Sequence, residues 1–128
     1  MSFQALGLSW GMLAAAVLLN VFGLYAVKVT LGALGAVPVG SVAALTDYFV
    51  IFARSPLALL GVACILAAPL PHAIALSRMP LGVAYPASVA LTCLVVIPLS
   101  ILSLGEPPDA VRLAGLVMLL VSIAMLFR

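Results

Sequence analysis

The stretch Leu18–Lys28, LLNVFGLYAVK, decides the fold class, because it is part of a long apolar run. Within that run it contains one amide and one lysine. Apolar runs of about 20 residues are typical of membrane-spanning helices. In a helix that rises about 1.5 Å per residue, Asn20 and Lys28 would lie about 12 Å apart along the axis, with Asn20 deep in the hydrocarbon and Lys28 nearer one interface. Asn20 can therefore bind a substrate or join two helices, and Lys28 can bind an anion or extend to the interface.

The composition excludes an ordinary soluble domain, since the 128 residues are 67% hydrophobic and only 6% charged. The length predicts a single domain, residues 1–128. The net charge of +2 is too small to indicate a nucleic-acid partner. Cys64 and Cys93 fall in apolar runs and are interpreted as packing residues. The sequence shows no metal-ligand spacing, cofactor motif or catalytic set, so we expect no metal, no cofactor and no enzyme activity. Because the N-terminus lacks the basic start of a signal peptide, we expect the first apolar run to be retained.

Four segments are long and apolar enough to be membrane spans. Backbone groups in lipid must be paired within the segment, so each is predicted to be helical. Together they predict an all-α integral membrane protein, a four-transmembrane-helix bundle. The segments are approximately Ala5–Thr30, Pro56–Ser77, Leu81–Leu104 and Asp109–Phe127. The first carries Gly7, Gly11 and Ala15 at four-residue spacing, a stripe suited to close helix packing.

A short helix is expected between the first two spans. Helix-breaking residues should end the first span; these are Gly32, Gly35, Pro38 and Gly40. The segment Ser41–Ala53 then looks helical but is too short to cross a bilayer. We interpret it as an interfacial helix with Asp47 at the water and Arg54 just beyond it. The alternative is that it extends one of the neighbouring spans.

Prolines and glycines mark the breaks in the later spans. Pro69 and Pro71 should kink the second span, and His72 beside them is either hydrogen-bonded to a neighbour or functional. The four residues 77–80 predict a tight hairpin between the second and third spans. The third span should be broken at Pro86 and Pro98.

The last connection carries most of the remaining charge. Gly105 should end the third span, and Pro107, Pro108 and Asp109 should start the fourth. Asp109 and Arg112 are interpreted as capping and surface ion-pairing residues, whereas Glu106 stays a candidate for the site. Basic residues are nearly balanced between the two ends, so the sequence fixes no membrane orientation.

Three motifs resemble the small multidrug resistance family. The segment PLGVAY, residues 80–85, resembles its P-x-G-x-A-Y signature at the start of the third helix. Residues 104–126 resemble its last loop and fourth helix. Asn20, Val21 and Gly23 followed by Lys28 resemble its first-helix motif E-V-x-G-x-x-x-x-K. The motifs occur in the family's order over nearly the whole chain.

Departures from that pattern indicate a branch of the family. The drug exporters carry a membrane glutamate where this chain has Asn20, and a Trp and a G-x-G soon after the matching tyrosine, where this chain has Pro86, Ser88, Ala90 and Thr92. The first connection is also longer. These features resemble the Arn-type subunits that flip aminoarabinose-phosphoundecaprenol. The resemblance implies a multi-pass protein of the bacterial inner membrane that works as a homodimer or with a paralogous subunit.

The residues and the resemblance together predict a flippase for an anionic lipid carrier, such as a polyprenyl-phosphate-linked sugar. Lys28 and Arg54 would attract the phosphate, and Asn20 and Tyr85 would hydrogen-bond sugar hydroxyls. His72 and Glu106 complete the set of candidate substrate-binding residues.

Two other functions stay open. One is a proton-coupled exporter of small cations, although such an exporter needs a titratable acid inside the membrane and the three acids of this chain all fall in connections. The other is a non-transporting subunit or scaffold for a glycosyltransferase or another membrane enzyme. In that case Asn20 would join helices and Lys28 would extend to the interface.

Overall fold

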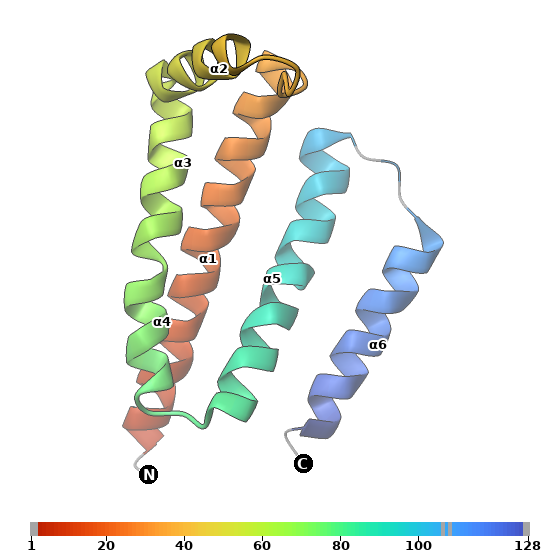
Figure 1. The fold of residues 1–128 in the computed structure, drawn as a ribbon. Coiled ribbons are helices and arrows are strands. Elements are labelled where there is room, and N and C mark those ends of the chain that lie inside the picture. The colour runs from red at the N-terminus through yellow and green to blue at the C-terminus, as the bar shows by residue number, and fades with distance from the viewer. Residues whose placement is uncertain (1–2, 106, 108, 127–128) are drawn as a thin grey trace.

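The computed structural model describes residues 3–105, 107 and 109–126, and every regular element among them is a helix. These elements are α1 (Phe3–Leu34), α2 (Val42–Arg54), α3 (Pro56–Ala67), α4 (Pro69–Leu76), α5 (Leu81–Leu104) and α6 (Ala110–Leu126). In Figure 1, α2 crosses one end of the molecule, α3 and α4 run back beside α1, and α5 lies between α1 and α6. The first turn of α1 and the last turn of α6 lie at the same end. The all-α prediction is confirmed.

Long apolar helices identify the chain as a membrane-embedded, multi-pass protein. By length and composition, three described segments can cross a membrane: Gly7–Leu34, Pro56–Leu76 and Leu81–Leu104. The second of these consists of α3 and α4 together. Ala110–Met125 of α6 forms a shorter apolar helix, so three of the four expected spans meet both criteria. Large apolar side chains cover the outside, as in Leu66 and Leu102, which are 72% and 83% exposed. A large apolar surface of this kind is stable in contact with lipid tails and unfavourable in contact with water.

The packing of α1 against α3 and α4 depends on small residues seven positions apart. The two rows are buried in the structure, and they comprise Ser9, Ala16, Gly23 and Thr30 on α1, and Gly61 on α3, Ala68 between α3 and α4, and Ala75 on α4. A Cβ added at Gly23 would lie 2.6 Å from the carbonyl oxygen of Gly61. Helix backbones approach this closely only where side chains are absent. By contrast, an added Cβ at Gly7 or Gly11 would meet nothing within 4 Å, so these two glycines of the expected stripe make no close contact with the part of the chain that the structure describes.

The first helix is longer than expected, because Gly32 does not break it. Glycine lowers helix stability by only about 1 kcal/mol and keeps its N–H, so the hydrogen-bonded ladder can continue through it. The helix ends at Leu34. Gly35 then takes a left-handed conformation, with φ of 83°, and its N–H donates to the Leu31 carbonyl at 3.0 Å.

A separate helix, α2, follows the first span, so the alternative that it extends a neighbouring span is wrong. Tyr48 fixes it against the end of α1, because its hydroxyl donates to the Gly35 carbonyl at 2.8 Å. Tyr48 is only 8% exposed, whereas Asp47 and Arg54 are exposed. The ring of Phe49 lies edge-on to that of Tyr48, with the ring centroids 6.2 Å apart.

Removing the Tyr48 hydroxyl should loosen this attachment. We expect Tyr48→Phe to lower the free energy of local opening by about 1 kcal/mol, the usual net contribution of one such hydrogen bond. Hydrogen–deuterium exchange over residues 35–54 would measure it as faster exchange. Thr46→Val is the matched control, because the Thr46 hydroxyl donates only to the Val42 carbonyl of the same helix. Exchange that is equally fast in the wild type and in Tyr48→Phe would contradict the prediction.

The prolines act differently in the two spans that contain them. The second span is interrupted as expected, since α3 ends at Ala67 and α4 starts at Pro69. The expected breaks at Pro86 and Pro98 are wrong, because α5 runs unbroken through both prolines. Each proline removes only one N–H donor from a 24-residue helix, and membrane helices tolerate this where neighbouring helices and local adjustments compensate.

The connections after α4 and α5 agree with those predicted from the sequence. Residues 77–80 form the tight turn that makes α4 and α5 a hairpin. Gly105 ends α5 in a left-handed conformation with φ of 65°. Asp109 caps α6 as predicted, because its Oδ1 accepts a hydrogen bond from the Val111 N–H at 3.0 Å. The expected contributions of Glu106 and Pro108 lie outside the described residues.

Candidate functional site

Two cavities follow each other along the line where α1 faces α5. The first, here called the polar cavity, has a volume of about 530 Å³ and lies between α1, the α3–α4 break and α5. The second, here called the cationic cavity, has a volume of about 480 Å³ and lies between α1, α5 and the start of α6. Of the residues that the structure describes, none lines both cavities. Successive turns of α1 line first one and then the other, with Val17 and Asn20 in the polar cavity and Val21, Leu24 and Lys28 in the cationic one.

The polar cavity brings together three of the predicted site residues. Asn20 comes from α1, His72 from α4 and Tyr85 from the first turns of α5. Asn20 and His72 are partly buried, and Tyr85 is 61% exposed. The break at Ala68 and Pro69 lines the same space, so the interruption of the span lies beside His72. An amide, an imidazole and a phenol from three helices therefore face one volume.

Hydroxyl groups on α5 add hydrogen-bond acceptors to this cavity. The Ser88 hydroxyl donates to the Tyr85 carbonyl at 2.8 Å, and the Thr92 hydroxyl donates to the Ser88 carbonyl at 2.7 Å. Both side chains line the cavity. A hydroxyl that donates to its own helix still has lone pairs that can accept. The polar cavity thus offers both donors and acceptors, which suits an uncharged ligand with several hydroxyl groups.

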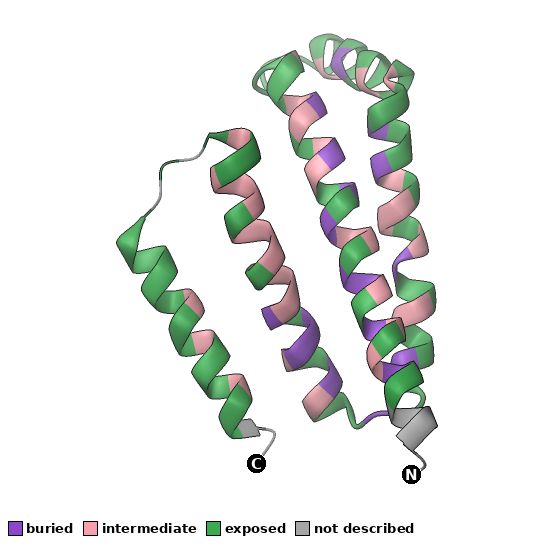
Figure 2. Ribbon diagram, turned by 180° about the vertical axis from the view of Figure 1, so that it is seen from behind, coloured by how far each residue is buried: buried purple, intermediate pink, exposed green. Residues whose placement is uncertain are grey.

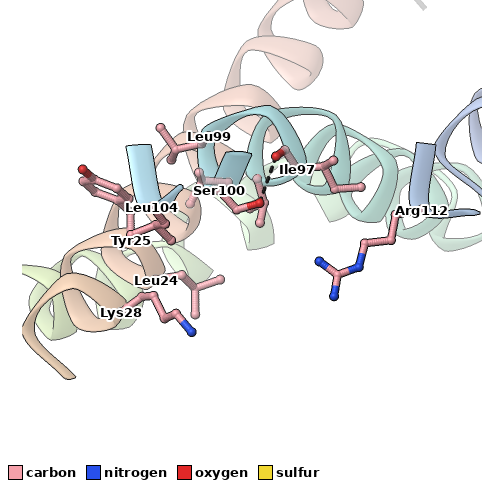
Figure 3. A pocket seen from close by; sticks show the side chains of 10 residues that line it. Leu24, Tyr25, Lys28, Ile97, Leu99, Ser100, Leu104 and Arg112 are labelled. Carbon is pink, nitrogen blue, oxygen red and sulfur yellow. Dashed lines mark hydrogen bonds between the residues drawn. The ribbon is translucent and has the colours of Figure 1, made fainter. Parts of the chain in front are cut away.

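The cationic cavity joins Lys28 to a second basic residue, Arg112. Lys28 comes from the later part of α1 and Arg112 from the first turn of α6. Figure 3 shows their charged groups pointing toward one another across this space. Ser100 on α5 lines it too, and its hydroxyl donates to the Ile97 carbonyl at 2.9 Å. Two cations that face one cavity favour an anionic ligand.

The structure does not place the remaining two candidates, Arg54 and Glu106, in either cavity. Arg54 ends α2, is exposed and lines neither cavity. Glu106 lies outside the described residues. Asp47 and Asp109, the two acids that the structure describes, also line neither cavity. Among the described residues, both cavities are therefore lined without any carboxylate.

Sequence reasoning did not place Arg112 in the cavity, although it identified the residue. The sequence signal was the predicted topology, in which the last helix starts at the same end of the bundle where the first helix carries Lys28. Charge alone gave no reason to pair the two residues. The rows of small residues at seven-residue spacing were missed as well, and that spacing was visible in the sequence.

None of the protein-family models, curated proteins or solved structures that were compared with this chain matches it. The resemblance to the small multidrug resistance family therefore depends on the sequence motifs alone. Function has to be argued from the helices and the two cavities.

Proposed function

We propose that this protein is a small membrane translocase, similar to the small multidrug resistance family, that moves an anionic lipid carrier between leaflets. The substrate would be a polyprenyl-phosphate-linked sugar or a similar lipid. The observation that carries the proposal is the sign of charge in the cavities: Lys28 and Arg112 line one of them, and no described acid lines either. Such a lining attracts a phosphate and repels an organic cation.

The two cavities fit the two polar parts of such a substrate. A phosphodiester would lie at Lys28, because ammonium groups are common partners of phosphate. The sugar would occupy the polar cavity, where Asn20, His72 and Tyr85 can hydrogen-bond its hydroxyls. The polyprenyl chain would stay in lipid along the exposed apolar helix faces.

The membrane arrangement belongs to the same proposal. The helix α6 has 17 residues, which corresponds to about 25 Å and is near the lower limit for a span. We take it as the fourth span. We place α2 in the interface, because Phe49 is exposed on the side of the helix opposite the exposed Asp47. Arg54 would then gather anionic head groups at the surface.

A dimer would complete the transport path. Among the described elements α6 contacts only α5, and none of its described residues is buried (Figure 2). This exposed helix would face the second subunit, either identical or paralogous, and the path would run along the interface between the two subunits. The sequence resemblance suggests the bacterial inner membrane as the location.

The test is transport in proteoliposomes with Lys28→Gln. We expect transfer of a labelled phosphoundecaprenol-linked sugar between leaflets to fall about tenfold or more, since a lost charge-assisted hydrogen bond costs about 1.5–3 kcal/mol. Arg78→Gln is the matched control, because Arg78 is exposed and lies at the opposite end, in the α4–α5 turn. Wild-type transport by Lys28→Gln would contradict the proposal. Proton-coupled transport of small cations would contradict it too and would favour an exporter.

A further inference from the structure

The cationic cavity contains two basic residues that come from helices without direct contact. Lys28 belongs to α1 and Arg112 to α6, and α5 lies between these helices (Figure 1). Among the described elements no contact joins α6 to α1. Among the described elements, α5 is therefore the one that contacts both the helix of Lys28 and the helix of Arg112.

The direction of the two side chains is the second observation. The Lys28 amino group and the Arg112 guanidinium point toward one another (Figure 3), although like charges repel. Each residue also takes part in a further interaction within the chain. The cavity of about 480 Å³ has room for a phosphate or diphosphate group. Both cations are exposed, and the lining around them is largely apolar and includes Leu24 and Leu104.

We propose that Lys28 and Arg112 form one two-residue site for a phosphate-class anion, whose binding connects α6 to α1. This deepens the proposed function and rests on it only in taking Lys28 as the phosphate partner. Arg112 adds what a lysine cannot supply, a planar fork that donates two parallel hydrogen bonds to one phosphate. Lys28 adds a point charge from the other side.

Each residue has a separate task in this arrangement. An anion held by Lys28 alone would leave α6 where it is. An anion held by both residues draws the start of α6 toward α1 and closes the cavity over the phosphate. Arg112 is thus assigned a substrate-binding role in addition to the ion-pairing role that the sequence indicated.

The phosphate can come from a lipid head group or from solution, and the experiment separates these sources. Full-length protein in detergent would be titrated with radiolabelled inorganic phosphate and pyrophosphate by equilibrium dialysis, at constant ionic strength set with chloride. In a second arm, native mass spectrometry would compare retention of phosphatidic acid with that of phosphatidylcholine. The variants are Lys28→Gln, Arg112→Gln, their combination and Arg112→Lys, with Arg78→Gln as the control.

We expect each single Gln variant to weaken anion binding about tenfold and the double variant to weaken it further, because each residue gives its own charge to the one ligand. Arg112→Lys should retain part of the affinity, which a purely structural role would not require. Binding of phosphatidic acid without binding of inorganic phosphate would support the site with a lipid as its ligand. Binding of phosphatidic acid and of inorganic phosphate would support the site with either source of phosphate. Size-exclusion profiles without anion would establish that each variant folds.

Two results would overturn the inference. One is wild-type affinity in Arg112→Gln together with a loss in Lys28→Gln, which would leave Lys28 as the sole anion partner and the proposed function intact. The other is equal binding by every variant, including the double one. A different result would disprove the proposed function, namely lipid transport at the wild-type rate by Lys28→Gln in proteoliposomes.

Discussion

Replacing Gly23 with alanine should force α1 away from α3 and destabilise the protein by about 2 kcal/mol, within the usual range for overpacking a tight contact. The added Cβ would lie 2.6 Å from both the Gly61 carbonyl oxygen and Ile65 Cγ1, and 3.1 Å from the Ile65 nitrogen. Two of these atoms belong to the backbone, so a side-chain rotation cannot relieve the clash. Unfolding in detergent, followed by far-UV circular dichroism, would measure the loss.

The same helix provides the control. An alanine Cβ at Gly32 would meet nothing within 4 Å, so Gly32→Ala should leave stability unchanged or raise it by up to about 1 kcal/mol. Gly61→Ala should behave like Gly23→Ala, because its added Cβ would lie 2.9 Å from the Gly23 carbonyl oxygen. The double variant should cost less than the sum of the two, since one displacement of the helices relieves both clashes. Equal stability of Gly23→Ala and Gly32→Ala would show that the helices do not meet here.

Sequence reasoning predicted the helices better than their packing, and the reason is physical. Length and apolarity predicted both bounds of α5 correctly. The local backbone chemistry of Gly105 marked the end of α5, and that of Asp109 marked the start of α6. In a membrane, both the lipid-facing and the protein-facing sides of a helix are apolar. Hydrophobicity therefore does not identify the buried side, and small residues are the better signal. The Gly7 and Gly11 stripe was an ambiguous case of that signal.

The candidate site shows the same limit. Asn20, His72 and Tyr85 were identified one by one, because each is a polar residue in or beside an apolar span, and the structure brings all three to one cavity. Their meeting depends on how three helices cross, which no single segment encodes. The pairing of Lys28 with Arg112 depends on the same crossings. Polar residues can thus be found from the sequence, whereas the cavity that they share requires the fold.

Replacing Asn20 with leucine should abolish most transport of a lipid-linked sugar. Leucine has nearly the shape of asparagine but no hydrogen-bonding group, so the sugar hydroxyls that enter the polar cavity would lose a partner. An unpaired polar group in a low-dielectric site costs about 1–3 kcal/mol, which corresponds to a decrease of roughly 5- to 150-fold. The measurement is transfer of a labelled phosphoundecaprenol-linked sugar in proteoliposomes. Leu18→Ala is the control, because Leu18 is 59% exposed on the same helix and lines neither cavity.

The result also decides between the two roles of Asn20. If Asn20 binds the sugar, Asn20→Leu should keep wild-type stability and wild-type binding of inorganic phosphate, because Lys28 and Arg112 lie in the other cavity. If Asn20 only joins helices, the same substitution should lower stability and leave transport per folded molecule unchanged. Asn20→Gln would retain the amide on a longer chain and should recover part of the transport only in the first case. A stable Asn20→Leu protein that transports the lipid at the wild-type rate would remove the polar cavity from the path and leave the phosphate as the only recognised group.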